Sequence, residues 1–240
     1  VTLFMSMMAI FKVMLYKYTN QEDICIGTSV ANRNYDEIEE LIGFFANRLV
    51  LRNSVKGDSL FKDFLNQIKD STLDVFNNQD VSFEKIVERV QPERDLSRNP
   101  LFQIAFIFNN NEIIPSINIG ELTVVVKDYV QKTSKFDLAF NVIETDSELD
   151  IFIEYNTDLF KDSTINRMFE HYDTLISSIL TNPNYTIDQL NILGEEEKNK
   201  ILVEFNKPKA DKLYDKSFIE LFKEQARISP SERALVFENQ

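Results

Sequence analysis

Apolar residues fill almost every position of the first stretch of the chain, "VTLFMSMMAIFKVMLYKY". A pattern that is apolar nearly all round predicts a helix buried on most sides, and four of the five methionines lie in it. Lys12 interrupts the run, which is short for a bilayer span, and no basic n-region or cleavage site marks a signal peptide. Since such a helix normally lies inside a larger protein and no initiator methionine precedes it, we expect the chain to be a fragment.

Helical and strand-like spacings alternate in the stretch that follows. The expected elements are a buried strand over Ile24–Val30, a short helix or turn in "YDEIEELIGFF" and a strand in "NRLVLRNSV". Apolar positions from Leu60 to Phe76 keep helical spacing, with Asp58 as the predicted N-cap. A polar corner, "NNQDVS", then precedes a second helix, "FEKIVERV".

Beyond residue 100 the apolar residues recur at every second position. In "FQIAFIF" the residues Phe102, Ile104, Phe106 and Phe108 alternate with others, as expected for a strand. We also predict a buried strand in "ELTVVVK", and a β-hairpin from "FDLAFNVIE" and "ELDIFIEYN" around "TDS". From Asp162, a predicted N-cap, to Leu180 the spacing is helical again.

The composition shifts after residue 194. Residues 195–214 are charged and nearly free of apolar runs, which predicts a linker. A new amphipathic helix, "SFIELFKEQARISP", and a strand, "RALVFENQ", then indicate the start of another domain over residues 215–240. For residues 1–194 the alternation of helical and strand-like segments predicts an α/β fold, an α+β sandwich in which helices pack on a mixed sheet.

Composition excludes several classes of protein. A net charge of −13 argues against nucleic-acid binding, which needs a clustered basic face. The five glycines are too scattered for a phosphate cradle, and one cysteine with one histidine cannot close a structural zinc site. A single cysteine also excludes an internal disulfide and favours a reducing, cytoplasmic compartment.

Isolated reactive residues have plain structural interpretations. His171 lies at the edge of an apolar helical stripe, so we expect a surface position rather than a general base. Cys25, in "ICI", fits a buried strand and has no neighbouring base that would make it a nucleophile. Asp146, Glu148 and Asp150 are better explained as a charged hairpin tip than as a cation site, since no calcium-loop glycine accompanies them.

Two polar groups have a stronger claim to function. Asn47 at a strand start and the pair Gln79–Asp80 are candidates, although Asp80 also suits an N-cap for the helix near Phe83. A third stretch combines charges and hydroxyl or amide groups in one loop: Arg94, Asp95, Ser97, Arg98 and Asn99. Arginine stays protonated at any working pH, so we interpret this loop as a structural brace rather than a catalytic centre.

Three stretches carry a family resemblance: "IGFFANRLVLR" (Ile42–Arg52), "NQDVSFE" (Asn78–Glu84) and "RDLSRNPL" (Arg94–Leu101). They resemble, in order and spacing, the fifth to seventh core motifs of nonribosomal peptide synthetase condensation domains. Ser82 replaces a usual proline and Arg48 a common threonine. The resemblance covers residues 1–205, and "FIELFKEQARISPSERALVFENQ" is similar to the opening of an adenylation domain.

The resemblance implies a role. The chain would be the C-terminal lobe of a two-lobed, chloramphenicol acetyltransferase-like fold that joins two substrates through an amide bond. Both substrates would ride on phosphopantetheine arms of upstream and downstream peptidyl carrier domains, with no directly bound cofactor, metal or membrane. The catalytic His-His-x-x-x-Asp-Gly signature is absent here and is expected upstream, so no catalytic residue is assigned and the fragment alone is expected to be inactive.

The resemblance also implies a place for the candidate residues. It places Asn47, with Gln79 and Asp80, as candidates for the wall of a tunnel between the lobes. Two alternatives stay open: another acyl- or ester-forming relative of the same fold, and a non-catalytic scaffold or docking domain.

Overall fold

The computed structural model describes residues 1–91, 95, 98–110, 116–120, 122–125, 133–145, 148–207 and 216–233. The chain divides into two compact units, Val1–Gly194 and Glu195–Gln240. The larger unit contains the central sheet and the residues that the sequence singles out.

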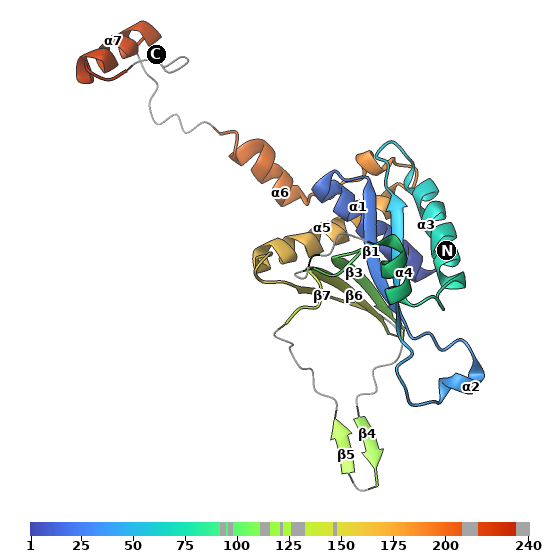
Figure 1. Ribbon diagram of the computed structural model, residues 1–240. Coiled ribbons are helices and arrows are strands. Elements are labelled where there is room, and N and C mark those ends of the chain that lie inside the picture. Colours follow the sequence, from blue (N-terminus) through green and yellow to red (C-terminus); the bar gives the residue numbers. More distant parts are fainter. Residues whose placement is uncertain are drawn as a thin grey trace. The chain divides into compact units, whose positions relative to one another are not determined.

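A five-stranded mixed sheet forms the centre of the larger unit, in the order β2–β1–β3–β6–β7 (Figure 1). Its strands are β1 (Asp23–Val30), β2 (Asn47–Ser54), β3 (Ile104–Asn109), β6 (Leu138–Glu144) and β7 (Leu149–Tyr155). β1 pairs antiparallel with β2 and parallel with β3, β3 pairs parallel with β6, and β6 and β7 form an antiparallel hairpin. The predicted α/β fold with a mixed sheet and the predicted hairpin are therefore confirmed.

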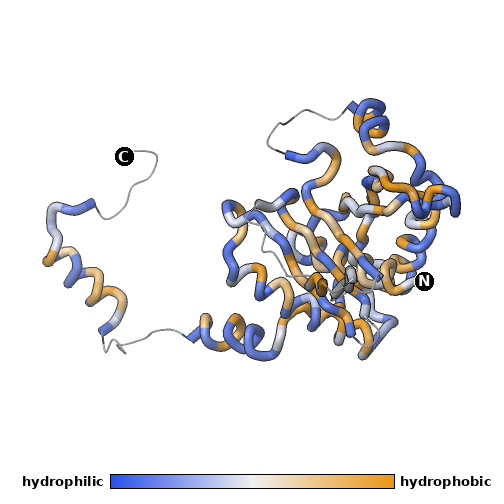
Figure 2. The backbone as a smooth tube through the Cα atoms, turned by 90° about the horizontal axis from the view of Figure 1, so that it is seen from below, coloured by the Kyte–Doolittle hydropathy of each residue, from blue (hydrophilic) through white to orange (hydrophobic). Residues whose placement is uncertain are grey.

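Helix α1 (Leu3–Thr19) lies against one face of this sheet, with α3 (Phe61–Asn77) and α5 (Asp162–Thr181) on either side of it (Figure 1). The ring of Phe11 packs on Phe106 and Phe140 of the sheet, and Tyr172 of α5 packs on Phe140. Hydrophobic and hydrophilic residues are interspersed along the strands (Figure 2), whereas α1 is buried from Met7 to Leu15. The prediction of a first helix buried on most sides is confirmed. Among the described residues no helix is long and apolar enough to cross a membrane.

The opposite face of the sheet is covered near β2 by α4 (Phe83–Val90) and over β1 by an aromatic cluster. Phe102 is the middle member of this cluster, with its ring centroid 5.7 Å from those of Phe83 and Phe136. The predicted alternation is therefore wrong at Phe102, which precedes β3 and lies on the other face from its supposed partners Ile104, Phe106 and Phe108. A sharp turn at Leu101, described below, causes this reversal.

The segment "ELTVVVK" forms part of a separate two-stranded sheet. Strands β4 (Ser116–Ile119) and β5 (Leu122–Val125) pair antiparallel across a turn in which Gly120 has a left-handed φ of 62°. Leu122 is 70% exposed and Val124 is 46% exposed, so the prediction of a buried strand is wrong for these residues. A two-stranded ribbon has no second layer to cover its side chains.

Two predicted helix caps differ from the structure. The N-cap of α3 is Leu60, not Asp58, and the first helical N–H, that of Phe61, donates to the carbonyl of Tyr185 at 3.2 Å. Asp162 is the first residue of α5 rather than its N-cap, and its carboxylate accepts a hydrogen bond from the Tyr155 hydroxyl at 2.5 Å. In α3 a carbonyl distant in sequence takes the position that a local cap would fill, whereas the N-cap of α5, Lys161, makes no side-chain capping bond.

The smaller unit contains short helices. Helix α6 (Glu195–Asn199) and a π-helical turn, η2 (Lys200–Glu204), occupy the first half of the predicted linker. The predicted helix after the linker is α7 (Phe218–Ile228), whose start has a capping box between Ser217 and Glu220. Hydrophobic and hydrophilic residues alternate along its turns (Figure 2). The predicted strand "RALVFENQ" lies outside the described residues, apart from Arg233.

Candidate functional site

Asn47, the first residue of β2, holds the polar corner that precedes α4. Its Nδ2 donates to the carbonyl oxygens of Gln79 at 2.7 Å and Val81 at 2.8 Å. Its Oδ1 accepts the backbone N–H groups of Phe83 at 3.1 Å and Arg48 at 2.9 Å. The amide thus uses both donors and its acceptor to join β2 to the start of α4, and we call this set of contacts the Asn47 clamp.

The structure brings the three predicted tunnel candidates together. Gln79 contributes its main-chain carbonyl to the Asn47 clamp, and the Asp80 carboxylate accepts a long hydrogen bond of 3.5 Å from the Asn34 amide. The interpretation of Asp80 as a helix cap is wrong: the N-cap of α4 is Ser82, and the first helical N–H is bonded to Asn47. A side chain from β2 occupies the position that Asp80 would need.

The predicted brace loop is only partly described. Arg94 and Ser97 lie outside the described residues. Arg98 lies with its Nε 3.7 Å from a carboxylate oxygen of Asp95, and more than half of each side chain is exposed. An ion pair this exposed contributes little to stability, because water screens both charges.

Stronger contacts follow at the C-terminal end of the same loop. The Asn99 Nδ2 donates to the carbonyl of Lys135 at 2.7 Å, and the Gln103 amide donates to the carbonyl of Asn99 at 3.1 Å. The backbone N–H of Asp137 donates to the carbonyl of Gln103 at 3.0 Å. These bonds join the start of β3 to the segment that leads into β6.

Leu101 turns the chain sharply between this loop and β3. Its φ is 72°, and the N–H of Phe102 donates to the carbonyl of Pro100 at 3.0 Å, which together give the rare γ-turn with positive φ. The Cys25 thiol donates to the Leu101 carbonyl at 3.4 Å. A non-glycine residue in this conformation costs about 1–3 kcal/mol and persists only where its surroundings impose it. Here the packed ring of Phe102 holds the turn in place.

Within the part of the chain that the structure describes, the lone histidine and cysteine lie in structural surroundings. His171 is buried, not on the surface as predicted, and its Nδ1 lies 2.7 Å from the Tyr18 hydroxyl. The error arose because the end of α1 covers this flank of α5, a contact that helical spacing does not show. Cys25 is half-buried in β1, and burial raises the pKa of its thiol, which disfavours the nucleophilic thiolate.

Lys12 is the polar residue whose importance sequence reasoning missed. Its side chain is fully buried, and its Nζ donates to Asn53 Oδ1 at 2.5 Å and to the carbonyls of Leu51 at 2.8 Å and Ile24 at 3.5 Å. The Asn53 amide in turn donates to the Ser71 hydroxyl at 2.8 Å, which extends the network from α1 through β2 to α3. Burial lowers the pKa of Lys12 to about 7.

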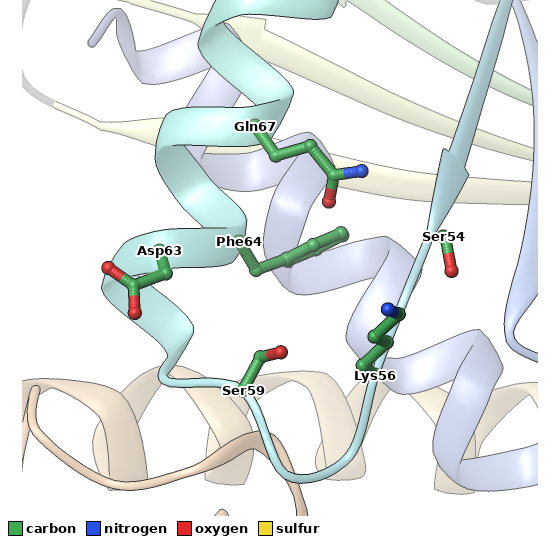
Figure 3. Close-up of a pocket in the computed structure, with 6 residues that line it drawn as sticks. All are labelled: Ser54, Lys56, Ser59, Asp63, Phe64 and Gln67. Atoms are coloured by element: carbon green, nitrogen blue, oxygen red, sulfur yellow. The ribbon is translucent and has the colours of Figure 1, made fainter.

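A pocket of about 430 Å³ opens between the end of β2 and the first turns of α3 (Figure 3). It is lined by Ser54, Lys56, Ser59, Asp63, Phe64 and Gln67. The side chains of Phe64 and Gln67 point from α3 toward the β2 side, whereas Asp63 points away (Figure 3). In the sequence Phe64 belongs to the apolar stripe of α3 and the other five residues are ordinary polar positions of a strand end, a turn and a helix, so no signal marked the pocket. Asn47 and Ser54 are the two ends of β2, so the pocket is separate from the Asn47 clamp.

The described groups favour positioning over proton transfer. Near the Asn47 clamp lie Asp80, an exposed carboxylate bonded to an amide, and Arg48, whose guanidinium is 5.8 Å from the centroid of the Phe83 ring. No cluster of three or more His, Cys, Asp or Glu that could hold a metal occurs within the described ranges. The Asn47 clamp and the brace loop both fix loops through side-chain amides that donate to main-chain carbonyls.

Comparison with known proteins identifies the class to which this fold and these motifs belong. The family model for the condensation domain matches residues 1–202, and the chain therefore belongs to the condensation domain family. It is 39% identical over 239 residues to bacitracin synthase 3 of Bacillus licheniformis, and 37% identical over 241 residues to gramicidin S synthase 2 of Brevibacillus brevis. These matches cover 100% of this chain but only 4% and 5% of the two relatives.

Solved structures show the same fold. A four-domain nonribosomal peptide synthetase, crystallised in its holo form with AMP and glycine, superposes with a TM-score of 0.83 at 24% identity, over 98% of this chain and 19% of that one. The X-domain from teicoplanin biosynthesis gives a TM-score of 0.73 at 22% identity, over 80% of this chain and 44% of that one.

Proposed function

We propose that this chain is the C-terminal lobe of a condensation domain that forms an amide bond between two carrier-bound aminoacyl or peptidyl substrates. The observation that carries the proposal is the match of the condensation family over residues 1–202, which includes the motif around Asn47. The two synthetases named above are relatives at 39% and 37% identity, and their names describe assembly of the peptides bacitracin and gramicidin S.

In this proposal the lobe aligns the two substrates, and none of its residues transfers a proton during amide formation. The 240 residues contain no His-His-x-x-x-Asp-Gly motif, and the one histidine is buried against Tyr18. Holding two tethered reactants in alignment can itself supply several kcal/mol of rate acceleration, about 7–11 in the best cases. The Asn47 clamp supports this role because it fixes the polar corner that contains Gln79 and Asp80 against the sheet.

The same proposal assigns partners and domains. Residues 1–194 form the lobe, residues 195–214 link it, and residues 215–240 begin an adenylation domain. The carrier domains on both sides would present their substrates on phosphopantetheine arms, and the catalytic signature would lie in the N-terminal lobe. The division of the structure after Gly194 supports the first boundary.

Amide formation by the synthetase that contains this chain tests the proposal. Both neighbouring carriers are loaded, the donor with a labelled amino acid, and the dipeptidyl thioester is detected by mass spectrometry of the acceptor carrier. We expect product from the wild type and a reduced rate for Asn47→Ala, whose matched control Asn34→Ala should retain the wild-type rate.

The same assay separates the alternatives. Ester product from a hydroxy-acid acceptor, with no amide product, would favour the ester-forming relative. Loaded carriers that give neither product would favour a scaffold or docking domain, and the proposal would be wrong.

A further inference from the structure

The pocket between the end of β2 and the first turns of α3 gathers hydrogen-bond donors from three parts of the chain. Ser54 ends β2, and Lys56 and Ser59 lie in the connection that follows it. Gln67 joins them from α3. Within the described residues, none of these four side chains makes a hydrogen bond or an ion pair. Single unpaired polar groups are normal at a protein surface, but several that converge on one recess indicate a binding site.

The donor groups decide which charge a ligand would carry. Lys56 is the basic residue of the lining, and the Ser59 side chain points toward the side of the pocket where Lys56 lies (Figure 3). Asp63 is the acidic residue of the lining, and its carboxylate points away from the pocket (Figure 3). A lysine ammonium binds phosphate as a point charge, and phosphate oxygens accept further hydrogen bonds from several directions. The lining therefore suits a phosphate group.

The size and polarity of the pocket indicate what the phosphate group is attached to. The volume of about 430 Å³ exceeds what a bare phosphate ion fills and lies in the range of small-molecule sites. Five of the six lining residues are polar or charged, and the sixth, Phe64, is only 2% exposed. A body that carries hydroxyl groups fits such a lining better than an apolar body does.

Backbone contacts hold the pocket in shape without a ligand. The N–H groups of Ile187 and Asp188 donate to the carbonyls of Ser59 and Gly57, each at 2.9 Å. A Cβ atom on Gly57 would lie 2.3 Å from the Asp188 carboxylate oxygens, so only a residue without a side chain allows this approach. The connection between β2 and α3 is thereby fixed to the 3₁₀ turn η1 (Ile187–Gln189). Preorganisation of this kind lowers the entropy cost of binding.

We propose that this pocket binds a small polar phosphate monoester, of the class of the polyol phosphates. The Lys56 ammonium pairs with the phosphate, and the hydroxyls of Ser54 and Ser59 donate to its oxygens. The net charge of −13 repels anions at long range, so binding depends on this local set of donors. The pocket and the Asn47 clamp lie at opposite ends of β2, and the proposal does not depend on amide formation.

Hydrogen exchange of the intact synthetase, followed by peptide mass spectrometry, tests the site. Glycerol phosphate is titrated at constant ionic strength, and glycerol and inorganic phosphate are titrated in parallel. We expect glycerol phosphate to slow exchange in peptides that cover residues 54–67 and in those that carry the Ile187 and Asp188 amides, because binding stabilises the folded form of both segments. Glycerol should slow neither, and inorganic phosphate should act only at higher concentrations.

Three substitutions of exposed residues assign the binding to the pocket. Lys56→Gln should raise the half-protecting concentration of glycerol phosphate about tenfold, since it removes a charge-assisted hydrogen bond. Lys69→Gln, which removes the same charge from α3 outside the lining, should leave that concentration unchanged. Asp63→Asn should lower it about twofold, because a repelling charge at the pocket is lost.

Several results would overturn the proposal. One is the absence of protection by glycerol phosphate, and another is equal protection by glycerol, which would show that no phosphate is recognised. Equal shifts for Lys56→Gln and Lys69→Gln would show that only overall charge matters. Protection by inorganic phosphate at the same or a lower concentration would show that the site takes the ion and not an ester.

Discussion

The ring of Phe102 occupies the space that a Cβ atom on Gly27 would need. Such a Cβ would lie 2.0 Å from Cε2 and 2.1 Å from Cζ of that ring, where real Cβ contacts essentially never fall below 3.0 Å. Phe102 is 2% exposed and packs between Phe83 and Phe136, so the ring has no free direction in which to move. The absence of a side chain at Gly27 therefore lets the loop before β3 close over the sheet.

Gly27→Ala should destabilise the larger unit by about 3 kcal/mol, because the Phe102 ring must leave its packed position. Phe102→Ala alone should cost about 3–5 kcal/mol, and the double variant should cost clearly less than the sum, since the methyl group then enters vacated space. Pulse proteolysis in urea, with cut sites located by mass spectrometry, measures each free energy of unfolding. Gly194→Ala, where a Cβ meets nothing within 4 Å, is the control. Additive costs would show that the two residues do not compete for space.

Asn47→Ala should destabilise the start of α4 by about 2 kcal/mol. The change removes two hydrogen bonds to carbonyls and the bond that caps the first helical N–H. Hydrogen exchange of α4 should accelerate accordingly, while exchange in α5 stays unchanged. Asn34→Ala, which removes only one long bond, should have little effect. Equal effects of the two substitutions would argue against the clamp.

Arg98→Ala should change the free energy of unfolding by less than about 1 kcal/mol, because its pair with Asp95 is exposed. This is below the roughly 3–5 kcal/mol that a buried charge pair would have implied for the brace. Asn99→Ala should lower the free energy of unfolding by more than Arg98→Ala does, since the Asn99 side chain joins the loop to Lys135. Pulse proteolysis of the two variants gives the comparison, and a larger loss for Arg98→Ala would restore the charge-based brace.

Stability should rise with pH above 7 on account of Lys12. Burial lowers its pKa in the folded chain to about 7, against about 10.4 when unfolded, so the unfolded state binds more protons between these values. The cost of burying the charge is complete below pH 7 and disappears as the pH approaches 10.4. Comparing wild type with Lys12→Met by pulse proteolysis at pH 7, 8 and 9 isolates this contribution. Identical pH slopes in the two proteins would contradict the assignment.

Helices and strands were predictable from the sequence where apolar residues recur with a regular spacing. The apolar run before Asn20 and the alternation in β6 and β7 gave the correct elements, because burial on one face leaves a repeating pattern. The same spacing placed Phe102 wrongly, since a single residue in the left-handed region, Leu101, reverses the side of the sheet on which the next side chain lies. Periodicity does not register such a turn.

Side-chain partners distant in sequence could not be predicted. Local rules assigned helix caps to Asp58 and Asp80, but the structure uses the Tyr185 carbonyl and the Asn47 amide. In the sequence Lys12 only interrupts an apolar run, whereas in the structure three acceptors on β1 and β2 surround it. The motif residues Asn47 and Gln79 came from a family resemblance. Their mutual contact, 32 residues apart, came only from the structure.

The position of α1 at the centre of the larger unit has a consequence for synthesis on the ribosome. The Tyr172 hydroxyl donates to the carbonyl of Met7 at 2.9 Å across 165 residues. At about 5–20 residues per second, α1 emerges roughly 8–33 s before its covering helix α5. During that interval its methionines and Phe11 lack their final partners, so nascent chains should depend on chaperones that bind apolar helices. Slower translation of residues 20–172 should lengthen this exposure and increase aggregation.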